Sequence, residues 1–359
     1  MANSVKILIV GEWAWPQYEE AFSRGLQENG VEVTSLSISK YFKGLFGRLQ
    51  SAIPFLGLAV FRLNKDVIQE VKIQKPHLVL FWRPTHVLPK TIKKIASMGV
   101  NTASYNNDDP FGPKAHGNVP WHHHFLWHWY IKCLPLFNYN FFYRKVNCTE
   151  ARMFGAKHTE VMLPYFMPWK DHPVKLTKVE KQRYETDLVF VGHHEKDERV
   201  NHIGALIKAG IRVKIWGGPY WNHKVLGELY DQLAPIELAD GDAYAKSLCG
   251  ASVCLCFLSK LNRDTYTRRC FEIPACGKVM LAERTDELLA MFKEDNEACF
   301  FSSTDELVAK AQWLVDNPKI QEEIAQAGLK RVWADGHDVV NRAKYFISMI
   351  NLKSNELEN

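Results

Sequence analysis

The chain has 359 residues, more than one hydrophobic core usually supports, so two domains of about 150–180 residues each are expected. An apolar fraction of 47% and a charged fraction of 24% exclude a disordered or fibrous protein. A net charge of +5 without a long Lys/Arg run excludes a dedicated nucleic-acid binder, and the longest apolar stretch, Ile53–Phe61, is too short to span a bilayer.

The first half of the chain alternates strand and helix patterns. Val5–Val10 is a continuous apolar run of the kind found in buried parallel strands, and Gly30 and Gly99 each follow a helical pattern. The predicted elements in chain order are strand Val5–Val10, helix Tyr18–Asn29, strand Val31–Ser37, helix Val67–Lys75, strand His77–Trp82, helix Lys90–Met98 and strand Asn101–Tyr105. This order predicts a mainly parallel sheet with helices on both faces.

A second alternation follows a charged, proline-containing stretch. Its predicted elements are strand Asp187–Val191, helix Val200–Ala209, strand Val213–Trp216, helix Ala243–Leu248, strand Val253–Phe257, helix Thr267–Ala275, strand Val279–Ala282, and helices Asp305–Val315, Pro318–Ala327 and Val339–Ile350. We therefore expect an α/β protein with two doubly wound, Rossmann-like domains at 1–168 and 187–335, a linker at 169–186 and a C-terminal helical segment at 336–359.

The loop after the first strand argues against a dinucleotide site. A pyrophosphate-binding turn needs the spacing G-x-G-x-x-G, and the chain has Gly11-Glu12-Trp13-Ala14-Trp15-Pro16 there. No cofactor is expected. Eight scattered cysteines are interpreted as buried free thiols, and the start of the chain has no secretory signal pattern, so a cytoplasmic location is expected.

The most informative segment in the chain is 262–277. Arg268 and Arg269 stand at a predicted helix start, where guanidinium groups and backbone N–H groups favour a phosphate. Glu272 lies one helical turn after Arg268, so its carboxylate can accept hydrogen bonds from a ribose beside that phosphate. A surface ion pair between Arg268 and Glu272 is the alternative interpretation.

The segment Thr267-Arg268-Arg269-Cys270-Phe271-Glu272-Ile273-Pro274-Ala275-Cys276-Gly277, followed by Glu283-Arg284-Thr285-Asp286-Glu287-Leu288, resembles a signature of the CgeB-like branch of group 1 glycosyltransferases. The resemblance runs from about Asp187 to Phe346, and more loosely over Tyr105–Tyr165. It implies a GT-B fold with two domains facing a cleft, a nucleotide-diphosphate sugar held by the C-terminal domain, no required divalent metal, and a C-terminal helix that returns to the first domain.

The resemblance also implies roles for single residues. It makes Glu272 the ribose ligand and places an acid eight positions earlier beside the donor sugar, where this chain has Asp264 in place of the usual glutamate. It places Thr267, Gly192 and Arg199 near the diphosphate. It matches Gly217, Gly218 and Tyr220 to a glycine-rich turn, with Trp216 and Trp221 offering faces for the base. A solvated charge run around Arg199 and a simple turn at Gly217 remain the alternatives.

Asp108 and Asp109 follow a predicted strand of the first domain. A carboxylate at that position can deprotonate an acceptor hydroxyl, and the resemblance favours Asp108, with Asp109 second. An Asx turn before Pro110 is the alternative.

Two aromatic segments are predicted to belong to the acceptor side. Trp121–Tyr130 lines an acceptor groove, touches a membrane interface or packs in the core; its His124 and His128 also have the i,i+4 spacing of a metal pair, but no partnered acid is evident. Tyr41–Leu63 sets Lys43, Arg48 and Arg62 among apolar residues, as an interfacial helix pair would. Asp240-Gly241-Asp242 is interpreted as a helix N-cap at Asp242 and not as a metal motif.

The sequence therefore predicts a metal-independent glycosyltransferase that moves a sugar from a nucleotide-diphosphate sugar to a glycan or lipid-linked acceptor, in cell-envelope or surface polysaccharide or glycolipid synthesis. Its expected location is cytoplasmic, with peripheral contact of the first domain to the inner face of the plasma membrane. The alternatives are a non-catalytic nucleotide-sugar or glycan-binding protein and a sugar-nucleotide epimerase of the same fold.

Overall fold

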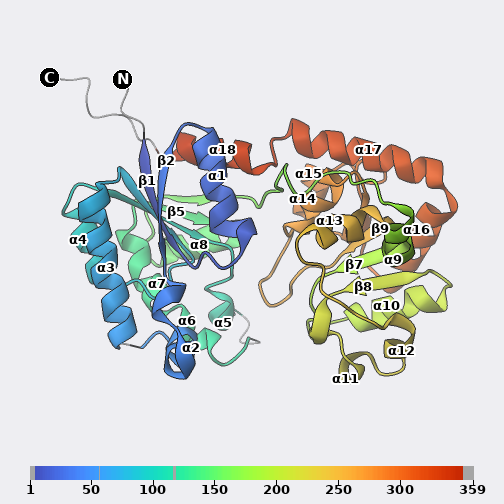
Figure 1. Cartoon of the computed structure of the whole chain (residues 1–359), viewed down its shortest axis with the longest axis horizontal. Helices are drawn as coiled ribbons and strands as arrows, with labels where there is room; N and C mark the ends of the chain where they lie inside the picture. The colour runs from blue at the N-terminus through green and yellow to red at the C-terminus, as the bar shows by residue number, and fades with distance from the viewer. Residues whose placement is uncertain (1–4, 56, 116–118, 351–359) are drawn as a thin grey trace. The chain divides into compact units, whose positions relative to one another are not determined.

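The computed structural model describes residues 5–55, 57–115 and 119–350 (Figure 1). Residues 351–359 of the predicted C-terminal segment lie outside this description. The chain divides into two compact units, unit 1 from Met1–Leu163 with Val339–Asn359, and unit 2 from Pro164–Asp338. Each unit is built on its own parallel sheet.

Unit 1 has a parallel sheet in the order β2-β1-β3-β4-β5-β6. Its strands are β1 (Lys6–Gly11), β2 (Glu32–Ser37), β3 (Leu78–Trp82), β4 (Asn101–Asn106), β5 (Tyr139–Phe142) and β6 (Thr159–Val161). Its longer helices are α1 (Ala21–Glu28), α2 (Gly44–Ala52), α3 (Leu58–Gln74), α4 (Pro89–Ala96), α8 (Lys145–Met153) and α18 (Val339–Met349). Its short helical elements are η1 (Pro16–Glu20), η2 (Ser39–Tyr41), α5 (Gly112–Ala115), α6 (His123–Leu126), α7 (His128–Cys133) and η3 (Leu134–Leu136).

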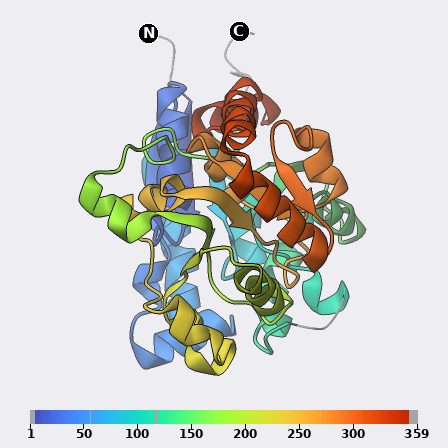
Figure 2. The ribbon, with the colours of Figure 1, turned by 90° about the vertical axis from the view of Figure 1, so that its right-hand side faces the viewer.

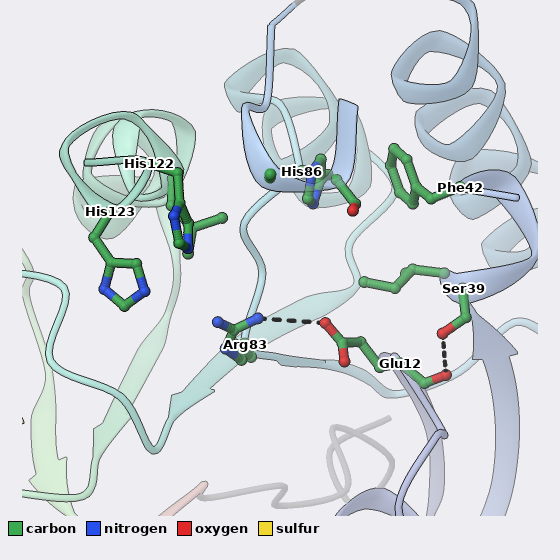
Figure 3. A pocket seen from close by; sticks show the side chains of 11 residues that line it. Glu12, Ser39, Phe42, Arg83, His86, His122 and His123 are labelled. Atoms are coloured by element: carbon green, nitrogen blue, oxygen red, sulfur yellow. Dashed lines mark hydrogen bonds and ion pairs between the residues drawn. The ribbon is translucent and has the colours of Figure 1, made fainter. Parts of the chain in front are cut away.

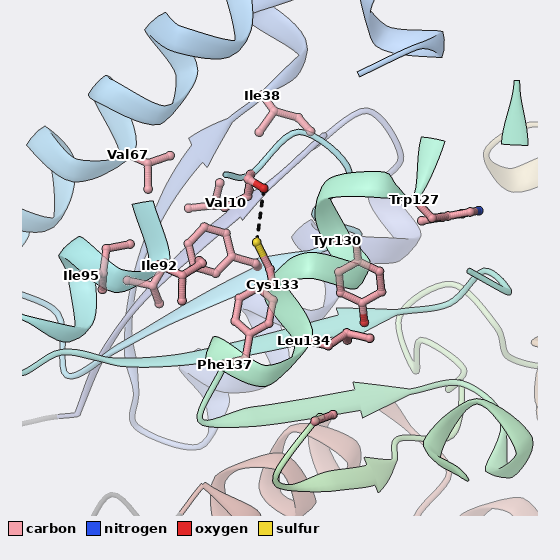
Figure 4. Close-up of a cluster of buried hydrophobic side chains, with 14 of the residues drawn as sticks. Val10, Ile38, Val67, Ile92, Ile95, Trp127, Tyr130, Cys133, Leu134 and Phe137 are labelled. Atoms are coloured by element: carbon pink, nitrogen blue, oxygen red, sulfur yellow. Dashed lines mark hydrogen bonds between the residues drawn. The ribbon is translucent and has the colours of Figure 1, made fainter. Parts of the chain in front are cut away.

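The core of unit 1 fills the space between this sheet and the helices on one of its faces. Tyr130 and Cys133 of α7 are fully buried there with Ile92 and Ile95 of α4 (Figure 4). The Cys133 thiol donates to the Val87 carbonyl oxygen at 3.4 Å, so it is engaged inside the core. The eight cysteines are free thiols; seven are buried, as expected, and Cys249 is partly exposed. Burial of each large apolar side chain stabilises the unit by roughly 1.5–3 kcal/mol.

Helix α18 belongs to unit 1, although the chain reaches it through unit 2. The Phe346 ring lies 5.4 Å from the ring of Phe22 on α1 and 4.9 Å from that of Phe141 on β5. Gly25 of α1 leaves the space for α18, because an added Cβ would lie 2.7 Å from the Val339 carbonyl oxygen. Asn29 Nδ2 donates to the Val340 carbonyl oxygen at 2.9 Å. The last helix therefore completes the first unit.

Unit 2 repeats the same strand arrangement in the order β11-β10-β9-β7-β8. Its strands are β7 (Thr186–Val191), β8 (Val213–Trp216), β9 (Ala251–Cys256), β10 (Val279–Glu283) and β11 (Cys299–Phe301). Its helices are α9 (Lys178–Tyr184), α10 (Arg199–Lys208), α11 (His223–Leu226), α12 (Leu229–Leu233), α13 (Asp242–Cys249), α14 (Arg269–Ala275), α15 (Asp286–Met291), α16 (Thr304–Asp316) and α17 (Pro318–Ala334), with the turn η4 (Gly218–Tyr220). Helix α17, in orange-red in Figure 2, packs on α14.

Three local expectations differ from the structure. The stretch 169–186, predicted as a linker, lies inside unit 2 and contains α9, because Thr177 and Glu180 form a capping box that starts a helix. Asp242 is the first residue of α13 and not its N-cap, which is Gly241 at φ 56°. The predicted helix Val67–Lys75 is the last part of α3, which begins at Leu58 and buries Val60, Leu63, Val67 and Val71.

Candidate functional site

Both sheets reverse their direction of winding between the first and third strands of their unit. In unit 1 this switch point lies between β1 and β3, and in unit 2 it lies between β7 and β9. Open α/β sheets bind ligands beyond the carboxyl ends of the strands at such a point. The residues that follow these four strands, Glu12, Arg83, Gly192 and the loop after Phe257, are therefore the first candidates in each unit.

In unit 2 the switch point is formed by glycines that allow a close approach of two turns. Trp221 donates from Nε1 to the Gly192 carbonyl oxygen at 2.7 Å. An added Cβ at Gly217 would lie 2.2 Å from that same oxygen, and Gly218 has φ +62°, so neither position tolerates a side chain easily. The sequence-predicted Gly192, Gly217 and Gly218 therefore meet in space.

The aromatic residues of this turn are placed differently from the expectation. Trp216 and Trp221, predicted to offer faces to a base, are 2% and 1% exposed. Trp216 stacks on Tyr184 with 5.2 Å between ring centroids, and Trp221 fills the space below Gly217. Tyr220 is 60% exposed, so it is the aromatic residue of the turn that a ligand can reach.

Arg199 is 2% exposed and holds the loop after β7 in place. Its Nε donates to Asp197 Oδ2 at 2.9 Å, and its Nη1 donates to the His193 carbonyl oxygen at 2.9 Å. Its Nη2 donates to the Leu258 carbonyl oxygen at 3.2 Å. These contacts connect the loops that follow β7 and β9. The Arg199 side chain therefore has a structural role at the switch point and does not face a ligand.

Arg268 and Glu272 form a buried ion pair, not the surface pair that the sequence left open. Their side chains are 16% and 5% exposed, and Arg268 Nη2 contacts Glu272 Oε1. The Tyr244 hydroxyl donates to the other carboxylate oxygen of Glu272 at 2.5 Å. Both oxygens are therefore oriented by donors, and removal of one partner of such a pair costs about 3–5 kcal/mol.

Asp171 lies close to Glu272 and Arg268, and the sequence analysis did not predict it as a site residue. Its Oδ2 accepts from the Met167 N–H at 2.7 Å, and its Oδ1 is buried without a hydrogen-bond partner among the described residues. Burial, and then the negative charge of Glu272, raise the pKa of Asp171 to about 7. The carboxyl groups of Asp171 and Glu272 and the Arg268 guanidinium therefore interact electrostatically near the start of α14.

Arg269 points to the glycine turn. Its Nη1 would lie 3.4 Å from a Cβ built on Gly192, and its guanidinium stands 5.9 Å from the Phe190 ring centroid. Its Nε is buried and has no hydrogen-bond acceptor among the residues that the structure describes. The Nη1 end of the guanidinium, beside the glycine turn, is therefore the part of Arg269 that is placed to meet an anionic ligand.

Asp264 and Thr267 lie in the loop between β9 and α14. The Asp264 N–H donates to the Ser259 carbonyl oxygen at 2.9 Å, and the Thr267 N–H contacts the Cys270 sulfur at 3.5 Å. The structure thus places Asp264 and Thr267 in the loop that leads to Arg268, and brings Gly192, Gly217, Gly218, Arg269 and Glu272 into one neighbourhood.

In unit 1 the switch point contains a pocket of about 340 Å³, within the size range of small-molecule sites, roughly 300–1,000 Å³ (Figure 3). Glu12 and Arg83 lie side by side in its wall, with Arg83 Nη1 3.3 Å from Glu12 Oε1 (Figure 3). Its other lining residues are Ile38, Ser39, Phe42, Ser51, Ala52, His86, His122, His123 and Leu126. Polar and apolar side chains therefore meet in one concave site.

Asp108 is bound to the wall of this pocket through Arg83, whose Nε donates to Asp108 Oδ2 at 2.5 Å. Burial alone would raise the pKa of the Asp108 carboxyl, but Arg83, with help from Arg144, lowers it below its usual value. Arg83 has φ +49°, an uncommon backbone conformation for a residue other than glycine. The backbone is therefore strained where the pair forms.

Asp109 has a structural role, which corrects the expectation that it is a second candidate base. It is 4% exposed, and its Oδ1 accepts from the N–H groups of Phe111 and Gly112 at 3.0 Å and from Asn147 Nδ2 at 2.9 Å. Three donors on one oxygen hold the turn before α5, the Asx-type turn that the sequence offered as the alternative.

The segment Trp121–Tyr130 is partly core and partly pocket. Trp127 and Tyr130 are buried, whereas His122 and His123 line the pocket. Partial burial and the neighbouring His122 and Arg83 lower the pKa of His123, while Asp108 raises it. His123 is therefore a neutral imidazole at neutral pH, close to a carboxylate. His124 and His128, which have the spacing of a metal pair, do not line this pocket, and the described residues contain no group of three or more potential ligands for a metal ion.

Comparison with solved structures identifies the fold. Sucrose-phosphate synthase from Thermosynechococcus elongatus is similar at 11% identity and a TM-score of 0.66, covering 96% of this chain and 98% of its own. Anabaena HepE, solved with UDP-glucose, is similar at 13% identity and a TM-score of 0.64, with 96% and 99% covered. A putative UDP-N-acetylglucosamine 2-epimerase from Listeria monocytogenes is similar at 11% identity and 0.55, with 99% and 98% covered. The arrangement is the GT-B fold.

A sequence comparison matches part of the chain to a family model. Residues 199–348 match a family model described as glycosyl transferase-like, and they include Arg268, Arg269 and Glu272. The matched stretch is less than half of the chain and lies on a GT-B fold. No curated protein sequence matches it significantly.

The structure adds functional candidates outside the matched stretch that the sequence did not reveal, chiefly Glu12, Arg83 and His123 in unit 1 and Asp171 in unit 2. Glu12 and Arg83 are separated by 71 positions and have no motif in common. A usable signal was their position, because each directly follows a buried strand on one side of a switch point. Among the described residues, no helix is long and apolar enough to cross a membrane.

Proposed function

We propose that this protein transfers a glycosyl group from a nucleotide-diphosphate sugar to an acceptor hydroxyl. The observation that carries the proposal is the arrangement at the unit 2 switch point, where the Arg269 guanidinium lies beside the Gly192 turn, with its Nη1 3.4 Å from the position of an added Cβ. A guanidinium beside a glycine turn suits the oxygens of a diphosphate. Similar structures include one solved with UDP-glucose, which supports a nucleotide-sugar ligand of the same class.

In this proposal, unit 2 holds the donor. Arg268 and Arg269 stabilise the diphosphate as it departs, and Glu272 accepts hydrogen bonds from the ribose hydroxyls. Arg199 positions the two loops instead of contacting phosphate. The two guanidinium groups supply the positive charge that a leaving diphosphate requires, so no divalent metal is needed. Thr267, Asp264 and Tyr220 border the donor in the same scheme.

Unit 1 receives the acceptor. The bond between the anomeric carbon and the diphosphate oxygen breaks, the acceptor oxygen bonds to that carbon, and the acceptor proton leaves. In an inverting reaction, a base in unit 1 takes this proton. Because Arg83 lowers the pKa of Asp108, we assign proton abstraction to His123 and assign Asp108 the task of stabilising the imidazolium that results.

The acceptor in this proposal is a glycan or a lipid-linked glycan, and the reaction belongs to cell-envelope or surface polysaccharide or glycolipid synthesis. The motif around Arg268 supports the CgeB-like branch of the family. The protein works in the cytoplasm, with unit 1 on the inner face of the plasma membrane.

The first experiment is a thermal-shift screen with UDP, GDP, dTDP and CMP, followed by a transfer assay with the corresponding sugars. One nucleoside diphosphate is expected to raise the melting temperature, because a ligand that binds the folded state stabilises it. Stabilisation by none of them would contradict the donor site. For later variants of the donor-site arginines, Arg212→Met is the matched control, because Arg212 pairs with Asp187 on the surface of the same unit.

Two rival functions give different results in the same assays. A non-catalytic binding protein shows the thermal shift but no turnover. An epimerase, a possibility that the Listeria neighbour raises, releases an altered nucleotide sugar without any acceptor. Transfer that requires an acceptor and releases the nucleoside diphosphate in equal amount excludes both rivals.

A further inference from the structure

Helix α2 and the first turns of α3 expose a group of large apolar side chains on unit 1, here named the α2–α3 face. Leu45 and Leu58 are 88% and 72% exposed. The complete set is Leu45, Phe46, Leu49, Phe55, Leu58 and Phe61. Single exposed apolar residues are ordinary, but a contiguous group marks an interaction surface.

The amphipathic order of α2 is inverted relative to an ordinary surface helix. Its buried residues are Gly47 and Gln50, whereas its leucines and phenylalanine point outward. An added Cβ at Gly47 would lie 2.5 Å from the Phe42 backbone, so the inner side is packed too closely for a larger residue. The unit therefore holds α2 tightly by its small and polar side and presents its apolar side.

The charge on this face is mainly basic. Lys40, Lys43, Arg48 and Arg62 are exposed, and residues 39–65 contain no aspartate or glutamate. The next acid along α3, Asp66, accepts a hydrogen bond from the Tyr41 hydroxyl at 2.7 Å. None of the four basic side chains forms an ion pair with a residue that the structure describes. A basic rim around exposed leucine and phenylalanine side chains complements an anionic, partly apolar surface.

A groove between α2 and α3 combines the two features. It has a volume of about 520 Å³ and is lined by Lys40, Lys43 and Arg62 together with Phe46 and Leu58. The amino and guanidinium groups can bind a phosphate, and the ring and leucine can contact the start of an acyl chain. This is the chemistry of an anionic phospholipid at a bilayer surface.

We propose that the α2–α3 face docks on the surface of an anionic bilayer and that its groove binds the phosphate-bearing headgroup of one lipid. Leu45, Phe46, Leu49 and Phe61 enter the headgroup region, and the basic side chains contact the lipid phosphates. This assigns a lipid site to a specific groove and names its ligand class.

The same helix connects this face to the acceptor pocket. Ser51 and Ala52 at the end of α2 line that pocket, and His86, also in its wall, is 3.1 Å from the Gln50 carbonyl oxygen through its Nε2. This step rests on the proposed function. Docking places a lipid-linked acceptor so that its glycan can reach Arg83 and His123 while its lipid stays in the bilayer.

The test is co-sedimentation of the full-length protein with vesicles of phosphatidylcholine alone and of phosphatidylcholine mixed with phosphatidylglycerol. Binding is expected to the mixed vesicles and to fall with rising salt. The triple variant Lys43→Gln/Arg48→Gln/Arg62→Gln is expected to bind mixed vesicles on the order of a hundredfold more weakly, from the loss of three basic contacts. Leu45→Ser/Phe46→Ser is expected to weaken binding at all salt concentrations.

Met153→Ser and Val179→Ser are matched controls, because these side chains are 80% and 75% exposed on other helices and should leave binding unchanged. Equal binding to neutral and mixed vesicles, or undiminished binding by the triple variant, overturns the proposal. Self-association in lipid-free buffer that Leu45→Ser/Phe46→Ser abolishes also overturns it, by making a second copy the occupant. The nucleotide thermal shift is measured without lipid, so its failure and the failure of vesicle binding are separate results.

Discussion

Arg83 and Asp108 are joined by a 2.5 Å hydrogen bond at the edge of the unit 1 pocket, and the backbone of Arg83 is left-handed where the bond forms. A carboxylate held in this way keeps its negative charge and is a weak base. It can, however, stabilise a positive charge that forms nearby. That distinction separates the roles proposed for Asp108 and His123.

Replacement of Asp108 by asparagine tests this stabilising role. Asparagine keeps an oxygen that can accept from Arg83 but removes the negative charge, so glycosyl transfer is expected to fall by roughly 10²–10⁴-fold. The nucleotide thermal shift should persist, since the donor residues are in unit 2. Glu28→Gln removes a carboxylate from a surface pair with Arg24 and serves as the control. Full activity of Asp108→Asn would contradict the assignment.

The pH dependence of turnover tests His123. Partial burial lowers the pKa of this imidazole below its ordinary 6.5, so it is neutral at pH 7 and gains a proton only in more acidic solution. Transfer is expected to decline as the pH falls through that lowered pKa. His123→Gln should reduce kcat by about 10²-fold or more and remove the acidic limb. The control His124→Gln should retain the wild-type kcat and the acidic limb of the pH profile. An unchanged acidic limb in His123→Gln would show that a group other than His123 causes it.

The donor site is tested at Arg269. Arg269→Met keeps most of the side-chain volume but removes the N–H donors, so the affinity for the nucleoside diphosphate should fall about 10- to 100-fold, as for loss of a charged hydrogen bond. Isothermal titration measures this change, and circular dichroism verifies folding. Arg269→Lys, which keeps the charge without the fork, should give an intermediate affinity. Wild-type affinity in Arg269→Met would remove Arg269 from the site.

The raised pKa of Asp171 predicts how the stability of unit 2 depends on pH. Its pKa is raised to about 7 from an ordinary 3.8, so the folded unit favours the protonated carboxyl. The stability that this carboxyl contributes is complete below about pH 4 and is lost as the pH rises toward 7. Asp171→Asn should therefore reduce the decline in unfolding free energy between pH 4 and pH 7, on the order of a few kcal/mol. Urea unfolding at several pH values measures it, and parallel curves for the two proteins would refute it.

The sequence predicted those parts of the fold that are encoded locally. The strands β1, β3, β7 and β9 follow from continuous apolar runs, and the pairing of Arg268 with Glu272 follows from helical spacing. Strands β5, β6 and β11 were missed because they have three or four residues each, too few to show a period, and because they lack the Gly-Gly-Pro turn that marks the end of the equally short β8. In such short segments, pairing with a neighbouring strand decides the conformation.

The site was less predictable than the fold, for a related reason. Glu12 and Arg83 meet through the order of strands in the sheet, which local patterns do not encode. Arg199 and Asp109 are of the residue types that the chemistry requires. However, the Arg199 guanidinium donates to loop carbonyl groups, and the Asp109 carboxylate accepts from Asn147. Residue type and position suggest a site, whereas free hydrogen-bonding capacity depends on tertiary contacts that only the fold supplies.

The return of α18 to unit 1 has a consequence for synthesis on the ribosome. Val339, Ala343 and Phe346 are fully buried against unit 1, so that unit lacks part of its core until the end of the chain has been translated. Unit 2 is continuous and can fold as soon as it emerges. Unit 2 is therefore expected to mature before unit 1, and a ribosome that stalls before residue 339 leaves a folded unit 2, with the proposed donor site, beside an incomplete unit 1.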